Sequence, residues 1–417
     1  MSREMKDSGI AWIGEIPKGW EVRKMRTLGT FSASGIDKLV NPNESLVRII
    51  NYVDVYNNTK HELRKKDYMM VSASDEKITE HQVKIGDIIL TPSSETVDDI
   101  GVSSVVMEEL PNTAYSYHVL RFRSKDILNL SFKKYLTNNR FIAQYFSSRC
   151  NGTIRKTVSR EIFKECPILL PPLPEQQKIA EFLDRKCGEI DELVALQEKM
   201  IEELKAYKQS VITEAVTKGL NPNAPMKDSG IEWIDYVPKH WQIRKMKSII
   251  DLKSGSNLTA MEISEMDDGY LVYGGNGVRG TYGYYSHEGD YVLIGRQGAL
   301  CGNINYASGK FWVTEHALVC YLKESCALKW LGELLRAMNL NQYSLSAAQP
   351  GLSAERIRNL YVIVPPLSEQ QQIADYLDRK CAEIDELVAV KQQKIETLKE
   401  YKKSLIYEYV TGKKEVI

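Results

Sequence analysis

The sequence predicts an α+β protein, with two globular, mixed α/β domains separated by two long helices that pair as a coiled coil. The first observation is a long segment that occurs twice, nearly unchanged, at residues 171–217 and 365–411. The second is a shorter segment that also occurs twice, beginning at Met5 and at Met226. The stretches between these repeats do not resemble each other closely. A shared framework around divergent inserts indicates one scaffold that presents two different readers.

Both long repeats are predicted to be helices, because apolar residues recur at three- and four-residue spacing along them. The seam runs through Leu183, Cys187, Ile190, Val194, Ile201, Leu204 and Val211, and the second copy repeats it from Leu377 to Leu405. Polar residues interrupt it at equivalent places, at Gln197 with Lys391 and at Lys208 with Lys402, and such interruptions can fix the register of a coiled coil. We expect ~36 residues in each helix, or ~54 Å. A long amphipathic helix packed on a domain is the alternative.

The ends of these helices and the linker follow from proline, glycine and serine positions. Ser368 and Gln371 fit a capping box at the start of the second helix, whereas Pro174 stands in the equivalent place of the first. Residues 218–225 contain Gly, Asn and Pro and are predicted to be a linker. The predicted domains are therefore 1–170 and 226–364, with a central helix over 171–217 and a C-terminal helix over 365–417.

The two inserts, roughly 22–170 and 243–364, are predicted to share a strand-rich skeleton. The repeat offsets are 221 and 194 residues, so the first insert is 27 residues longer. Each insert carries a Gly-Asp turn leading into an apolar strand, at Gly86 and at Gly289. Each closes with a short helical segment, Ser159–Glu165 or Ser353–Asn359, whose serine is a plausible N-cap. A strand running into a Pro-Pro pair follows in both.

Composition excludes several classes of protein. Charged residues make up 26% of the chain and mean hydropathy is −0.33, which is typical of an ordinary folded protein rather than a disordered one. The N-terminus lacks the apolar core of a signal peptide, and no apolar run approaches the ~18 residues of a membrane span. Seven cysteines form no CxxC pair. These observations predict a cytoplasmic protein with reduced thiols.

No catalytic or metal-binding residue is predicted. Residues 275–280 match GxGxxG, but the following Thr-Tyr-Gly-Tyr-Tyr-Ser cannot start the helix that a dinucleotide site needs. A glycine-rich surface loop carrying Arg279 is the preferred interpretation. The chain has no P-loop motif, no HExxH, no paired Cys/His spacing and no Asn/Asp-Pro-Pro-Tyr tetrapeptide of the kind used to hold a flipped adenine. The sequence therefore indicates a binding protein without chemistry of its own.

Charge is distributed unevenly and favours a nucleic-acid partner. The chain as a whole has a net charge of zero, yet residues 121–164 contain eleven Lys or Arg against Asp126 and Glu161, a net charge of +9. Basic side chains contact phosphates and position a protein on DNA. A solvated basic face without a ligand is the alternative.

Candidate DNA contacts come from loops 91–100 and 295–301, which follow the Gly-Asp strands, and from residues near the closing helices. Arg and Gln side chains can read base edges, and helix N-termini suit phosphate. Turn residues and ordinary surface polar residues are the alternative for each. The predicted DNA-binding residues are Ser93, Ser94, Thr96, Arg149, Arg155, Lys156, Arg160, Arg279, Arg296, Gln297, Gln349 and Ser353.

Several segments resemble a known family, the DNA specificity subunit of type I restriction–modification systems. The pair KDSGIAWIGEIPKGW and KDSGIEWIDYVPKHW is similar to its opening motif, and the pair LPPLPEQQKIAEFLD and VPPLSEQQQIADYLD to its Leu-Pro-Pro-Leu-x-Glu-Gln-Gln signature. GGNGVRGTYG and GDYVLIGRQGALCGN resemble segments of its target-recognition domains. The resemblance covers essentially the whole chain in the right order.

The resemblance implies a non-catalytic, DNA-binding subunit for host defence. Two target-recognition domains, held apart by two antiparallel helices, would each read one half of a bipartite, asymmetric site in double-stranded DNA. The helices would set the spacing and dock two methyltransferase subunits, which bind S-adenosylmethionine, and motor–nuclease subunits would complete the complex. This chain itself would need no cofactor. Antiparallel pairing would give the chain an internal pseudo-twofold repeat, so that two methyltransferases could bind equivalently.

Four glutamines at equivalent framework positions are candidate partner contacts, namely Gln176, Gln177, Gln370 and Gln371. Helix capping is their alternative role. Other functions also stay open. The chain could be a single-chain methyltransferase with drifted motifs, a scaffold that binds no DNA, or a phase-variable or orphan copy that acts with methyltransferases and no nuclease.

Overall fold

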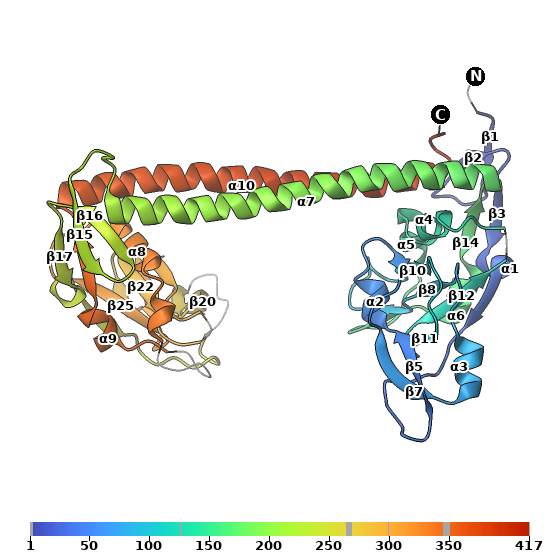
Figure 1. Cartoon of the computed structure of the whole chain (residues 1–417), viewed down its shortest axis with the longest axis horizontal. Helices are drawn as coiled ribbons and strands as arrows, with labels where there is room; N and C mark the ends of the chain where they lie inside the picture. The colour runs from blue at the N-terminus through green and yellow to red at the C-terminus, as the bar shows by residue number, and fades with distance from the viewer. Residues whose placement is uncertain (1–2, 126, 264–268, 299, 345–350, 417) are drawn as a thin grey trace. The chain divides into compact units, whose positions relative to one another are not determined.

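The computed structural model describes residues 3–416 apart from 126, 264–268, 299 and 345–350 (Figure 1). The chain forms two compact units. The first comprises Met1–Gln197 with Gln393–Ile417, and the second comprises Glu198–Gln392. Each unit therefore contains part of both long helices. The helices are α7 (Leu173–Lys218) and α10 (Leu367–Val410).

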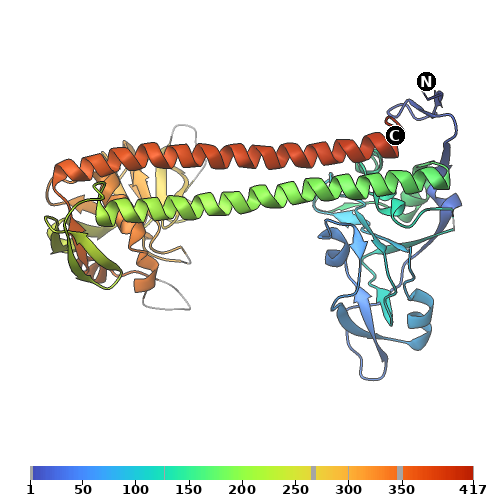
Figure 2. The ribbon, with the colours of Figure 1, turned by 45° about the horizontal axis from the view of Figure 1, so that its top comes forward.

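The two long helices pack together in antiparallel fashion, as the seam pattern and the family resemblance predicted (Figures 1 and 2). In the first unit, Lys402 Nζ lies 2.7 Å from Asp191 Oδ1, so the end of α10 faces the first half of α7. In the second unit, Lys208 Nζ lies 2.6 Å from Asp385 Oδ2. Both members of the second pair are related to the first by the repeat offset of 194 residues. The polar seam positions at Lys208 and Lys402 thus pair the helices in equivalent registers.

Both helices are longer than the ~36 residues expected, at 46 and 44 residues. Pro174 lies inside the first turn of α7, where its fixed φ suits a helix and no amide is needed for the ladder. The capping-box prediction at Ser368 is wrong. The amides of Glu369 and Gln370 already bond Pro366 O at 2.9 and 3.0 Å, so α10 begins before Ser368. At its end, α7 stops before Gly219, whose φ of 74° is typical of a residue just past a helix.

One sheet is common to the two units, which confirms the predicted shared skeleton. Ile88–Leu90 and Tyr291–Gly295 are the strands predicted after the Gly-Asp turns, and each lies inside its sheet. In the first unit the order is β4 (Gly29–Ser32), β12 (Leu120–Ser124), β8 (Ile88–Leu90), β10 (Ser103–Val106) and β6 (Glu62–Leu63). In the second it is β18 (Ile250–Ser254), β25 (Ala317–Leu322), β22 (Tyr291–Gly295) and β23 (Ile304–Ala307).

The remaining sheet differs between the units, and this is where their sequences diverge. The first unit has three strands in the order β11 (Thr113–Tyr115), β5 (Ser45–Ile50) and β7 (Met69–Ala73). The second has four in the order β20 (Gly277–Tyr282), β19 (Tyr270–Gly274), β24 (Lys310–Val313) and β21 (His287–Glu288). Short helices complete the first insert, namely α2 (Tyr52–Tyr56), α3 (Asp75–His81), α4 (Phe132–Thr137) and α5 (Arg140–Ser147). The second has α8 (Leu328–Ala337) and η2 (Leu340–Tyr343).

The repeated framework forms the same small elements in both units. Hairpins β1–β2 (Met5–Asp7, Glu15–Pro17) and β15–β16 (Met226–Ile231, Ile234–Pro238) come from the short repeats. Strand β3 (Glu21–Lys24) then pairs with β14 (Pro167–Leu170), and β17 (Gln242–Lys245) with β26 (Tyr361–Val364). One turn follows in each, α1 (Met25–Leu28) or η1 (Met246–Ser248). The predicted closing helices are α6 (Arg160–Glu165) and α9 (Ala354–Asn359), and the side chains of Ser159 and Ser353 cap them as predicted.

Equivalent contacts fasten the short repeat of each unit to a long helix. Trp20 Nε1 donates to Glu175 Oε2 at 2.9 Å in the first unit, and Trp241 Nε1 donates to Glu369 Oε2 at 2.9 Å in the second. Apolar seam residues of both long helices join the cores of the units, with Leu183 in the first and Leu377 in the second fully buried. Burial raises the pKa of the Cys187 thiol to about 11. Among the described residues, no helix combines the length and apolar character needed to cross a membrane.

Candidate nucleic-acid interface

The predicted reader loops leave the common sheet at the same point in both units. Leu90 of β8 pairs with Leu120, and Ile294 of β22 pairs with Leu318. Beyond these pairs, the amide of Val158 bonds Pro92 O, and the amide of Leu352 bonds Arg296 O, both at 2.8 Å. The backbone pattern therefore places Ser93 of the first unit where the second unit has Gln297.

In the first unit, this position is built around Arg155. Strand β9 (Ser93–Ser94) pairs with β13 (Lys156–Thr157), which brings Arg155 beside the loop. Arg155 Nε donates to Ser93 Oγ at 3.1 Å, and its guanidinium lies 5.4 Å from the centre of the Tyr52 ring. Burial raises the pKa of Tyr52, so its phenol stays neutral beneath this cation. An exposed guanidinium held on two sides can donate to phosphate or to a base edge.

In the second unit, the amide of Gln297 stands where the first unit has the hydroxyl of Ser93. Gln297 is exposed, and its Oε1 lies 2.8 Å from His316 Nδ1. Beside it, Arg296 donates from a terminal nitrogen to Ser254 Oγ at 3.0 Å. His316 lies in the turn between β24 and β25, and the amide of Arg296 bonds its carbonyl at 2.8 Å. The arrangement offers fixed hydrogen-bonding groups at the end of a rigid strand.

The glycine-rich loop at 274–277 packs closely against the backbone of Gln297 and His316 because its glycines have no side chain. A Cβ at Gly275 would lie 3.0 Å from Gln297 O and 3.1 Å from His316 O, tighter than ordinary contact. A Cβ at Gly295 would lie 2.1 Å from Gly275 O. The chain continues directly into strand β20, so a helix that could cradle a pyrophosphate does not follow. Arg279 is exposed on β20, and its stem packs beside Gly274.

Other residues predicted to bind DNA are engaged elsewhere. Arg149 lies over the rings of Tyr145 and Trp12, with its guanidinium 4.1 and 5.8 Å from their centres, and donates to Ser148 Oγ. Arg160 donates to Phe31 O, and Ser353 accepts the amide of Arg356 as a helix cap.

Predicted DNA-binding residues in loop 91–100 and in its partner strand are also buried or bonded within the protein. Ser94 is fully buried, so its side chain cannot contact DNA in this conformation. Thr96 is bonded to Asp99 Oδ2 at 3.0 Å, and Lys156 Nζ donates to Gly152 O at 2.7 Å. Gln349 lies outside the described residues.

The basic segment 121–164 does not form one continuous surface. Its net charge of +9 therefore overstates the number of cations that DNA could reach. Arg123 forms two bonds of 2.7 Å with the buried carboxylate of Asp87. Lys134 lies 2.5 Å from Glu62 and 2.7 Å from Asp184. Arg121 and Lys133 are also buried, and Lys133 donates to Gly86 O. These four cations hold the fold together.

The four framework glutamines divide into two kinds. Gln176 and Gln370 are buried, with 1% and 4% of their surface exposed. Gln176 Oε1 accepts the amide of Asn129, and Gln370 Oε1 accepts that of Ala327. Gln177 and Gln371 are exposed and bond only along their own helices, to Glu181 and Asp375 at 2.9 Å. In this conformation, only Gln177 and Gln371 can reach a partner.

Sequence reasoning missed two residues that the structure brings to the interface, Tyr52 and His316. His316 belongs to none of the motifs identified in the sequence. Its role depends on contact with Gln297, which a sequence pattern does not reveal. Tyr52 gave no signal in the sequence, because its contact with Arg155 joins residues 103 positions apart.

Comparison with known proteins agrees with this architecture. A family model described as the type I restriction modification DNA specificity domain matches residues 17–206 and 238–400. The specificity subunit of the type I restriction enzyme EcoprrI from Escherichia coli is 40% identical over 139 residues, which cover 33% of this chain and 35% of that relative. The match thus spans about a third of that protein. The specificity subunit of EcoKI from Escherichia coli K12 is 21% identical over 409 residues, covering 89% and 84%.

Solved structures show the same fold. A chain from a study of complex assembly and conformational transition in the type I R-M system has a TM-score of 0.73 at 16% identity, covering 95% of this chain and 99% of that one. The HsdS subunit from Thermoanaerobacter tengcongensis has a TM-score of 0.53 at 16% identity, covering 95% and 98%. These likenesses confirm the predicted fold class, two mixed α/β domains with two long helices packed together.

Proposed function

Because this chain belongs to the family of type I restriction–modification DNA specificity subunits, a non-catalytic part of that system, we propose that each unit reads one half of a bipartite, asymmetric site in double-stranded DNA. The membership confirms the resemblance found in the sequence motifs. One observation carries the proposal. The same point of the common sheet holds Ser93 with Arg155 in the first unit and Gln297 with His316 in the second.

Different polar groups at one topological position are what an asymmetric site requires. Each base pair presents its own pattern of donors and acceptors in the major groove. Arg155 offers only donors, which suit guanine or phosphate, whereas Gln297 offers a donor and an acceptor, which suit adenine. Lys156 lies next to Arg155 in sequence, and Arg279 is exposed on β20, and both would contribute phosphate contacts that carry no sequence information.

We assign the docking of two methyltransferase subunits to the long helices. Both helices expose large apolar side chains, between 44% and 58% accessible, at positions related by the repeat offset of 194. The pairs are Leu173 with Leu367, Leu193 with Leu387, Leu196 with Val390, and Tyr207 with Tyr401. Apolar groups repeated on otherwise charged helices favour a protein partner that binds twice. Those partners would bring S-adenosylmethionine, and motor–nuclease subunits would complete the restriction complex.

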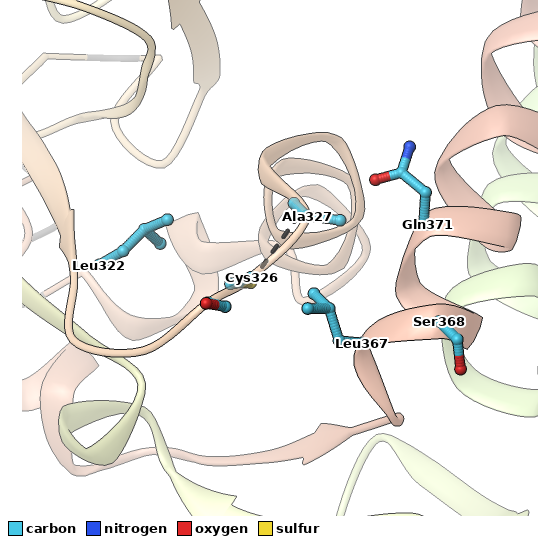
Figure 3. Close-up of a pocket in the computed structure, with 7 residues that line it drawn as sticks. Leu322, Cys326, Ala327, Leu367, Ser368 and Gln371 are labelled. Carbon is cyan, nitrogen blue, oxygen red and sulfur yellow. Dashed lines mark hydrogen bonds between the residues drawn. The ribbon is translucent and has the colours of Figure 1, made fainter.

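A hollow beside the start of α10 extends this surface in the second unit. It has a volume of about 650 Å³ and is lined by Leu322, Ser325, Cys326, Ala327, Leu367, Ser368 and Gln371. Figure 3 shows Gln371 on α10 and Leu322 on the opposite rim, with Leu367 between them. A partner would bury these exposed apolar side chains, and the exposed amide of Gln371, which bonds Asp375 on its own helix, would add a directional bond.

The length of the helices is consistent with a spacer. At ~1.5 Å per residue, 46 residues of α7 extend ~69 Å. A turn of DNA measures ~34 Å. We propose that this length sets the gap between the two halves of the target.

The proposal is tested by exchanging one insert. Residues 22–165 are replaced by the insert of another family member, and the chain is produced in cells together with its methyltransferase partner. Methylation sequencing is expected to show a gapped, two-part adenine-methylated motif in which only one half changes, and no such motif in cells lacking the chain. A change in both halves would refute the assignment of one half-site to each unit.

A further inference from the structure

Gln297 is exposed, yet its amide is held by a short chain of polar side chains. His316 Nδ1 lies 2.8 Å from Gln297 Oε1, and His316 Nε2 lies 3.1 Å from Glu315 Oε1. We propose that Glu315 and His316 fix the orientation of the Gln297 amide and thereby set the base that the second unit accepts at one position, an adenine. The inference rests on the proposed function, which it makes specific to one residue and one base.

The chemistry of the three side chains determines the orientation. A carbonyl oxygen only accepts hydrogen bonds, so His316 Nδ1 is the donor to Gln297 Oε1. One lone pair of Gln297 Oε1 is therefore used by His316. The other lone pair and the two Nε2 hydrogens are left for a ligand. Adenine presents N7 as an acceptor beside N6 as a donor, which matches this set, whereas guanine presents two acceptors.

The backbone around the amide is fixed by neighbouring segments, so the side chain has a defined starting point. The amide of Arg296 bonds His316 O at 2.8 Å, and Gln297 forms a bridge with Gly351. The amide of Gly255 bonds Ala317 O at 3.1 Å and ties β18 to the same turn. With the backbone held, the remaining freedom is the rotation of the Gln297 amide. His316 removes it, which lowers the entropic cost of binding in one orientation.

The first unit provides a matched comparison. His118 precedes Leu120 by two residues, as His316 precedes Leu318, so it occupies the equivalent turn. Ser93 stands in place of Gln297 and accepts a bond from Arg155, and the His118 ring lies 3.8 Å from that of Tyr117. His118→Ala is therefore the control for removing a histidine from this turn without loosening a reading amide.

The experiment uses the full chain with its methyltransferase partner in cells that carry a plasmid library. Every single-base variant of the half-site read by the second unit is present, and methylation of each variant is sequenced. A fixed orientation of the amide is part of what lets a bidentate pair discriminate adenine from the other bases. His316→Ala is therefore expected to lower discrimination at one adenine position about five- to tenfold and to leave the other positions unchanged. Gln297→Ala should act at the same position, and the double variant should be no worse than Gln297→Ala alone.

His316→Asn, whose amide can donate in place of Nδ1, should restore part of the discrimination. His118→Ala should leave the second half-site as it is in the unchanged chain. A uniform loss of methylation at every position of the half-site, effects of the two alanine variants on different positions, or additive effects would overturn the inference. Absence of any two-part motif with the unchanged chain and an active partner would overturn the proposed function itself, which separates the two failures.

Discussion

Replacing Gln176 by alanine is expected to destabilise the first unit strongly, although glutamine at the start of a helix is often a dispensable surface residue. The side chain is 1% exposed. Its Oε1 accepts the amide of Asn129 at 2.9 Å, and its Nε2 donates to Ile127 O at 3.1 Å and Pro171 O at 2.9 Å. Alanine would leave one amide and two carbonyl groups without these partners. At about 1 kcal/mol for each group, the expected loss of unfolding free energy is about 3 kcal/mol.

The adjacent glutamine supplies the control. Gln177 is exposed and bonds only Glu181, so Gln177→Ala should change stability by less than about 0.5 kcal/mol. The first unit holds 222 residues (197 and 25 in its two segments). For a unit of this size, about 3 kcal/mol corresponds to a fall in Tm of roughly 6–12 °C.

Scanning calorimetry of the full chain measures the shift, and hydrogen exchange locates it in the first unit. Gln177→Ala should instead weaken association with the methyltransferase while leaving Tm unchanged. Equal Tm shifts for the two variants, or protection lost in the second unit alone, would refute the reasoning that Gln176 fastens the helix to its own insert.

Three further predictions follow from the contacts described. Burial lowers the pKa of His61 to about 4, so the unfolded chain binds more protons below pH 6.5, and stability should fall by up to about 3 kcal/mol as pH drops from 6.5 to 4. His61→Asn, which tolerates the φ of 55° at this position, should flatten that slope in acid titration monitored by circular dichroism. Gly275→Ala should weaken methylation at the second half-site only, because its Cβ would press on Gln297 O and His316 O. The control is Gly283→Ala, whose Cβ would have open space, and it should behave as the unchanged chain does. A double-mutant cycle on Lys402 and Asp191, which are partly exposed, should give a coupling of about 0.5 kcal/mol that disappears in 1 M salt; a larger, salt-independent coupling would contradict this.

The framework could be predicted because its signals are local and occur twice. The apolar seam through Leu183 and Leu377, the serine caps at Ser159 and Ser353, and the Gly-Asp turns each depend on residues a few positions apart. Helix length was underestimated because the apolar seam runs only from Leu183 to Val211, whereas α7 extends beyond it at both ends.

The interface was harder to predict because its contacts join distant parts of the sequence. Lys134 looked like a DNA-binding cation, but it packs against Glu62, which lies 72 positions away. Gln176 looked like a surface residue, and its bonding partners lie 47 and 49 positions earlier. Gln297 was predicted as a reader from its residue type and loop. The support from His316 could not be predicted, because the two residues are 19 positions apart in separate loops.

The division of labour between repeated and unrepeated residues explains how one scaffold can present two readers. Contacts that hold the short repeat of each unit to a helix, such as Trp20 with Glu175 and Trp241 with Glu369, use the same residue types in both units. At the end of the common sheet the units differ, and Ser93 and Gln297 contribute little to either core because neither is buried. Substituting a reading residue therefore costs the fold little. Changing a fastening residue alters stability in its own unit. This separation lets the base that is recognised vary while the repeated contacts that hold each unit to its helix stay the same.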